Sequence, residues 1–172
     1  MARPNAPRQN NGAALPADFA RTLRELYASG DPRLGPTMKA ANEHGWTFAL
    51  LGSALELTGN RARQISMKNA GNEPVADIPE PVPGAPTTAD EPSRLTPEET
   101  ELLRALCDDA FSLKAGIKPA DRLQAEEKLD DALAEQWLRG VPFQHLADEL
   151  NFPDPAHVQG RVFQAWTRAT RK

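Results

Sequence analysis

Residues 48–58 read FALLGSALELT, and residues 143–154 read FQHLADELNFPD. When the two stretches are aligned on their first phenylalanine, both carry leucine at the fourth and eighth positions and a small residue, Gly52 or Ala147, at the fifth. Apolar residues at this spacing lie on one face of a helix. Thr47 can cap the first helix of the first stretch, and each stretch ends with a threonine or an aspartate that can cap a new helix. Each therefore predicts a short helix, a tight turn and the start of a second helix.

This pattern resembles the helix-turn-helix of bacterial and phage transcription regulators. In that motif two helices cross steeply over a short turn, and the second helix enters the major groove of DNA. The resemblance implies that the small residue stands where the two backbones approach, and that Leu57 or Phe152 fills the crossing. The chain departs from the family at a turn position often held by glycine, where it has Glu56 and Asn151, and Pro153 lengthens the second turn.

Helical periodicity also precedes the first motif. Phe19, Leu23 and Leu26 share one face of a helix that should end at Gly30. A shorter helix should follow over residues 36–44. No stretch of the chain sustains the two-residue alternation of a strand, so the expected fold class is all-α.

Similar signals recur in the C-terminal half. Thr96 begins a capping box with proline at the first helical position. A long helix should start near Pro119 and end at Gly140, and the last helix should start at Pro155. The chain is therefore expected to form two small helical bundles, each with a helix-turn-helix.

Composition divides the chain into four segments. Residues 1–15 are expected to form a disordered, polar, basic tail, and residues 16–70 are expected to form an N-terminal helix-turn-helix domain. Residues 71–95 hold six prolines and no aromatic residue, which is typical of a flexible, extended linker. Residues 96–172 form the second helical domain.

The distribution of charge points to nucleic acid, although the net charge is -4. Residues 1–72 carry nine Lys/Arg against five Asp/Glu, and residues 155–172 carry four Lys/Arg and no acid. Both candidate recognition helices thus lie in acid-free stretches, whereas solvated helix faces usually mix the two signs.

The outward residues of the two second helices are the candidate DNA contacts. Arginine can bind guanine O6 and N7, and asparagine or glutamine can pair with adenine. In the first unit the candidates are Asn60, Arg61, Arg63, Gln64 and Lys68. In the second unit the candidates are His157, Gln159, Arg161 and Gln164 for bases, and Arg168, Arg171 and Lys172 for phosphates.

We therefore predict a double-stranded DNA-binding protein, a transcriptional regulator or repressor whose two units reach adjacent half-sites. The alternative is an adaptor, such as a small phage packaging or assembly subunit, in which the helices of residues 96–140 bind a protein partner or a second copy of the chain. Trp137 then belongs either to the core or to that interface. Asp130 and Asp131 are interpreted as part of a solvated acidic face.

Other classes of function lack support in the sequence. Cys107 is the only cysteine, which excludes an intrachain disulfide and suits the reducing cytoplasm. His145 and Glu149 have i, i+4 spacing but no second ligand pair, so no metal or cofactor is expected. No apolar run reaches the roughly 18 residues of a membrane span. The chain is expected not to be an enzyme.

Overall fold

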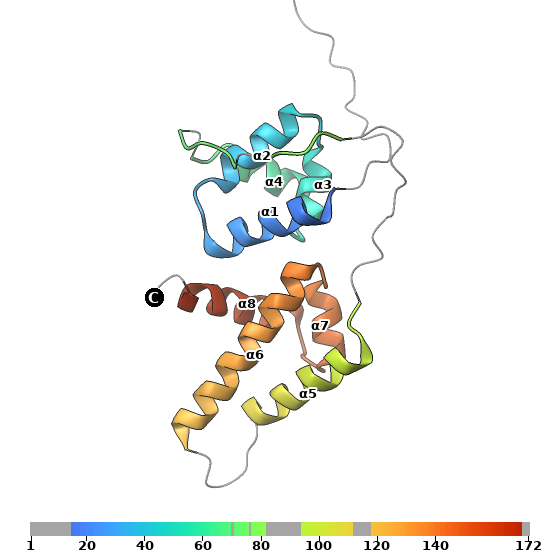
Figure 1. Ribbon diagram of the computed structural model, residues 1–172, viewed down its shortest axis with the longest axis vertical. Coiled ribbons are helices and arrows are strands. Elements are labelled where there is room, and N and C mark those ends of the chain that lie inside the picture. Colours follow the sequence, from blue (N-terminus) through green and yellow to red (C-terminus); the bar gives the residue numbers. More distant parts are fainter. Residues whose placement is uncertain (1–14, 70, 76, 82–93, 112–117, 170–172) are drawn as a thin grey trace, which may run out of the picture. The chain divides into compact units, whose positions relative to one another are not determined.

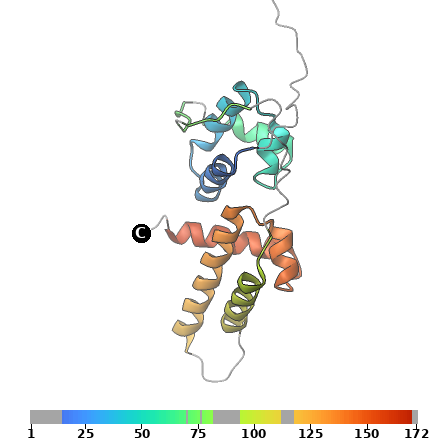
Figure 2. The ribbon, with the colours of Figure 1, turned by 45° about the vertical axis from the view of Figure 1, so that its right-hand side comes forward.

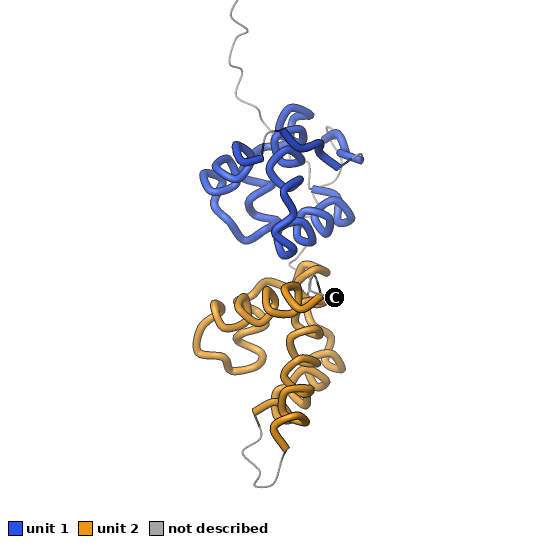
Figure 3. The backbone as a smooth tube through the Cα atoms, turned by 90° about the vertical axis from the view of Figure 1, so that its left-hand side faces the viewer, with its two compact units in different colours: residues 1–90 blue, residues 91–172 orange. Residues whose placement is uncertain are grey.

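The computed structural model describes residues 15–69, 71–75, 77–81, 94–111 and 118–169. Within these residues the chain forms eight helices and no strand, which confirms the all-α fold class (Figure 1). The chain separates into two compact units, residues 1–90 and residues 91–172 (Figure 3). Each unit is described by itself.

Unit 1 contains four helices around one core. They are α1 (Ala17–Ser29), α2 (Leu34–Glu43), α3 (Phe48–Ser53) and α4 (Gly59–Ser66). Both α2 and α3 pack against α4. The approach of α2 is close, because a Cβ on Gly35 would collide with the carbonyl oxygens of Ile65 and Lys68. The buried face of α4 therefore packs against α2 and α3.

The helix ends predicted at Gly30, Thr47 and Thr58 are confirmed, whereas α2 starts at Leu34, two residues before the expected start at residue 36. The hydroxyl oxygen of Thr47 accepts a hydrogen bond from the Leu50 N–H, and that of Thr58 accepts one from the Arg61 N–H, both at 3.3 Å. Gly30 ends α1 in the left-handed conformation, with φ of 66°. These caps separate α3 from α4 and give α4 a defined start.

Part of the segment expected as a linker belongs to unit 1. The Val75 N–H donates to the Thr37 hydroxyl at 3.1 Å, and the Trp46 indole N–H donates to the Pro79 carbonyl at 2.7 Å. Thr37 and Trp46 are both buried, so these bonds satisfy polar groups that have lost water. The prediction of a flexible linker that starts at residue 71 is therefore wrong for this part.

Unit 2 also contains four helices. They are α5 (Pro97–Phe111), α6 (Pro119–Arg139), α7 (Phe143–Glu149) and α8 (Pro155–Ala169). Helices α5 and α6 form an antiparallel pair, α8 packs on α6, and α7 packs on α8 (Figure 2). Trp137 is buried and stacks on the Phe143 ring at a centroid distance of 5.1 Å. Trp137 is thus a core residue.

The predicted capping box starts α5. The Thr96 N–H donates to a Glu99 carboxylate oxygen at 2.7 Å, and the Glu99 N–H donates to the Thr96 hydroxyl at 3.2 Å. Arg139 donates to both carboxylate oxygens of Glu99, which ties the end of α6 to the start of α5. The Arg139 bonds and the Thr96 N–H together lower the pKa of Glu99 from 4.5 to about 2.

Acid should therefore weaken unit 2 through Glu99. A carboxylate with a depressed pKa in the folded state stabilises the fold above its unfolded pKa, and this contribution is lost as the pH falls from about 4.5 to about 2. We expect Glu99→Gln to lower the urea midpoint at neutral pH and to lose this effect near the lower end of that range. Glu98→Gln, an exposed acid in the same turn, is the control. An equal effect of Glu99→Gln throughout the range would contradict this account.

Candidate nucleic-acid interface

The two predicted motifs form turns with the same backbone hydrogen bond. In unit 1 the Leu57 N–H donates to the Gly52 carbonyl at 2.8 Å, and in unit 2 the Phe152 N–H donates to the Ala147 carbonyl at 2.9 Å. These four residues stand at matching positions of the two aligned stretches. The bond joins the residue after the left-handed position to the end of the preceding helix, as in a Schellman motif.

The turn position that departs from the family pattern has the glycine conformation in both units. Glu56 and Asn151 each have φ of 55°. Asparagine tolerates this left-handed region better than most residues, and glutamate tolerates it less well. The same backbone geometry is therefore kept in both turns without glycine.

Gly52, near the end of α3, lies close to the backbone of the turn that leads into α4. A Cβ at this position would lie 2.7 Å from the Leu57 carbonyl oxygen and 3.0 Å from that of Thr58. Both of these are backbone atoms, so relief would require the turn to move. The matching residue of unit 2 is Ala147, and that turn contains one additional residue, Pro153.

Sequence reasoning missed a residue that holds the first turn. Arg24 on α1 donates from Nε to the Ala54 carbonyl at 2.9 Å, although 30 residues separate them. Burial lowers the pKa of Arg24, and the nearby Glu56 carboxylate acts in the opposite direction. Arg24 therefore supports the turn that positions α4, and no local pattern in the sequence indicates this contact.

Helix α4 has one face in the core and one face in solvent. Ala62, Ile65 and Ser66 are buried. The five candidate residues of unit 1 are all exposed: Asn60, Arg61, Arg63, Gln64 and Lys68. The expected register of α4 is thus the observed one.

The exposed face of α4 has positive charge that is not compensated within the described part of the chain. Arg61 donates from Nη1 to Gln64 Oε1 at 3.2 Å, a bond that leaves its charge in place. Among the described residues, no acidic side chain forms an ion pair with Arg61, Arg63 or Lys68. Three cations beside two amides make a surface that can contact phosphates and base edges.

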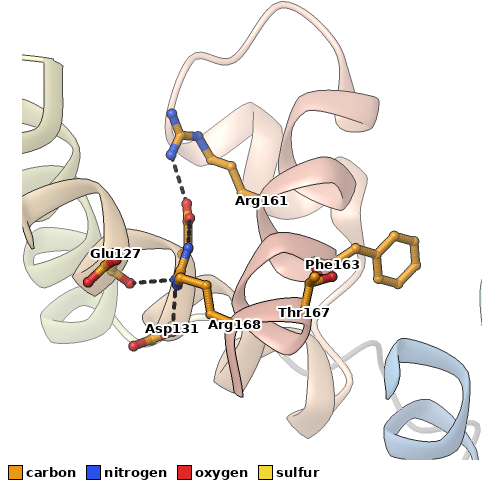
Figure 4. Close-up of polar contacts among 7 residues, drawn as sticks. Glu127, Asp131, Arg161, Phe163, Thr167 and Arg168 are labelled. Atoms are coloured by element: carbon orange, nitrogen blue, oxygen red, sulfur yellow. Dashed lines mark hydrogen bonds and ion pairs between the residues drawn. The ribbon is translucent and has the colours of Figure 1, made fainter. Parts of the chain in front are cut away.

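Helix α8 differs, because two of its cations point toward α6 (Figure 4). Arg161 Nη1 lies 2.7 Å from one carboxylate oxygen of Asp130, and Arg168 Nη1 lies 2.7 Å from the other. Arg168 Nη2 also reaches the Asp131 carboxylate at 3.1 Å and the Glu127 carbonyl at 3.3 Å. Both arginines were expected to contact DNA, and both have partners within unit 2.

The interpretation of Asp130 as a solvated acid is wrong. Asp130 is only 2% exposed. The helical period gives the signal for this, because Leu133, Ala134 and Trp137 follow Asp130 at i+3, i+4 and i+7 and are all buried. The acid that neutralises α8 therefore comes from a helix that is distant in the sequence.

The ion pairs determine how available these arginines are. Removing the partners of a buried carboxylate costs about 3–5 kcal/mol, whereas an exposed ion pair contributes about 0–1 kcal/mol. The Arg161 guanidinium also lies over the Phe111 ring, 4.7 Å from its centroid. Contact of Arg161 or Arg168 with DNA remains a prediction, and this balance of energies counts against it.

The other candidates of unit 2 that belong to the described residues carry no fixed positive charge. His157 and Gln164 are exposed and Gln159 is partly buried. Arg171 and Lys172 lie outside the described residues.

The described residues lack metal-ligand clusters and membrane-spanning helices. They contain no group of three or more His, Cys, Asp or Glu side chains placed to hold a metal ion. Among their helices, none combines the length and the apolar character that a membrane span needs.

Comparison of the chain with models of protein families, with curated proteins and with solved structures found no match.

A matched pair of substitutions tests the close approach at Gly52. Gly52→Ala should destabilise unit 1 by about 1–3 kcal/mol, because the new methyl group meets backbone atoms. Gly160→Ala, on the exposed side of α8 with no atom within 4 Å of its Cβ, should stabilise by about 0.5–1 kcal/mol. Urea unfolding measures both changes, and amide hydrogen exchange assigns each to its unit. Stabilisation of the same size at both positions would rule out the collision.

The buried carboxylate gives a second test. Arg161→Ala with Arg168→Ala should destabilise unit 2 by about 3–5 kcal/mol, because Asp130 is left buried and uncompensated. Adding Asp130→Asn to this double variant should recover more than half of the loss, since the charge is then gone. Urea unfolding of the variants, arranged as a mutant cycle, measures the coupling. A further loss on adding Asp130→Asn would show that the buried charge is not the cause.

Proposed function

We propose that this protein binds double-stranded DNA through the outward face of α4, in the manner of a helix-turn-helix transcriptional regulator or repressor. The observation that carries the proposal is the uncompensated positive face of α4. Arg61, Arg63 and Lys68 lie on it beside two exposed amides. The Thr58 cap and the close approach of Gly52 to the Leu57 and Thr58 carbonyl oxygens fix the position of α4, with this face toward solvent.

The proposal assigns contacts with bases to the N-terminal turns of α4 and contacts with the DNA backbone to its C-terminal end. Thr58 caps the start of α4, so the first turn presents Asn60 and Arg61 at its exposed end. In the helix-turn-helix geometry the N-terminal residues of the second helix meet the base edges. Lys68 lies beyond the C-terminus of α4 and suits a phosphate. Base contacts then come from the first turns of α4, and backbone contacts from its end.

A DNA-binding measurement on the full chain tests the proposal. If Arg61 and Arg63 contact DNA, Arg61→Ala with Arg63→Ala should lower affinity by about 1–3 kcal/mol per arginine. Affinity of the wild type for duplex should also fall by orders of magnitude between about 50 and 200 mM salt. Fluorescence anisotropy with random duplex and with duplex from in-vitro selection measures both effects.

Lys118→Ala with Lys128→Ala is the charge-matched control, because it removes two exposed cations from unit 2. This control should change affinity by less than about threefold if binding is specific to α4. Equal losses in the two double variants would show only a general effect of charge and would contradict the proposal.

A protein-binding adaptor is the second candidate, and one observation favours it. Leu102 on α5 and Leu123 on α6 are 59% and 58% exposed, which is high for leucine. A partner or a second copy could cover them. Stable oligomers that dissociate on Leu102→Glu or Leu123→Glu, together with weak and salt-insensitive DNA binding, would favour the adaptor.

A further inference from the structure

The second helices of the two motifs can be compared position by position. Thr58 directly precedes α4 and Asp154 directly precedes α8. The Asp154 carboxylate accepts a hydrogen bond from the Ala156 N–H at 2.8 Å, so both helices start with a side-chain cap. Counted from these caps, Ala62 corresponds to Val158, and both are fully buried. The two helices therefore share a register.

The outward positions differ in charge between the two helices. The corresponding pairs are Asn60 and Ala156, Arg61 and His157, Arg63 and Gln159, Gln64 and Gly160, and Lys68 and Gln164. Three of these positions carry lysine or arginine in α4 or just after its C-terminus, and none of the corresponding positions of α8 does. The outward face of α8 thus lacks the fixed positive charge that supplies most of the affinity for a duplex.

The arginines of α8 stand at other positions. Arg161 corresponds to Ile65, which is buried and seats α4 on its core. Arg161 likewise points inward, and its side chain is only 19% exposed beside Asp130. Arg168, two turns further along, pairs with the same carboxylate. The positive charges of Arg161 and Arg168 are therefore neutralised by acidic side chains of unit 2.

We infer that the chain has one DNA-reading helix, α4, and that the second helix-turn-helix is a structural copy whose α8 is tied to α6 and does not enter a groove. The inference rests on the proposed function. One chain then covers one half-site, and a palindromic site takes two chains. This differs from the expectation that the two units of one chain read adjacent half-sites.

Substitutions at corresponding positions, matched in their change of charge, test the inference in the full chain. The α4 pair is Arg61→Gln with Lys68→Gln and the α8 pair is His157→Glu with Gln164→Glu, and each pair lowers the formal charge by two. All four positions are exposed. His157 lies in the first turn of α8, where a glutamate is favoured, and glutamine at Arg61 and Lys68 keeps a polar side chain at an exposed position, so both variants should fold. Thermal unfolding checks this.

The expected result is a loss of duplex affinity by roughly 30-fold or more in the α4 pair and by less than threefold in the α8 pair. Hydroxyl-radical footprinting of the wild type should also show protected sugar-phosphate backbone on both sides of one major-groove segment per bound chain, a result that needs no variant. A comparable loss in the α8 pair, or two protected segments per chain, would overturn the inference and leave DNA binding intact. A wild type that does not bind duplex, or binding that neither pair affects, would overturn the proposed function and the inference with it.

Discussion

The buried carboxylate of Asp130 joins α6 to α8 through two ion pairs. Among the described residues it is the one acidic side chain that is buried. A charge in that position needs opposite charge beside it, and Arg161 and Arg168 supply it from α8. In unit 1 no described acid lies buried beneath α4, so the cations of that helix remain at the surface. The buried acid is thus one difference between the two motifs, beside the different charge of their outward positions.

The features that the sequence predicted well depend on a few neighbouring residues. The caps at Thr47, Thr58 and Thr96 and the left-handed Gly30 and Gly140 were all expected from local patterns, and the structure contains each of them. A side-chain cap or a C-terminal glycine acts within one turn of helix, so its signal survives without knowledge of the tertiary fold. The all-α class followed from the same local signals.

The features that the sequence did not predict depend on residues far apart in the chain. The ion pairs of Asp130 join residues 31 and 38 positions apart, and an acid-free stretch cannot reveal an acid on another helix. The contact of Arg24 with the first turn spans 30 positions. The proline-rich composition after residue 70 argued against burial, but Val75 and Ile78 still pack on the core of unit 1. For the candidate site, local patterns gave the exposed face of α4 correctly, but on α8 they did not reveal that Arg161 and Arg168 face α6.

The hydrogen bonds of Trp46 and Thr37 with the segment that follows α4 determine the minimum length of a fragment that keeps unit 1 intact. A fragment that stops at residue 70 would strip the acceptor from a buried indole N–H and would uncover apolar side chains beneath the segment. Such a fragment would be prone to aggregate, whereas one that extends through residue 81 keeps both bonds. Unit 1 therefore extends beyond the end of α4, at least to Pro79.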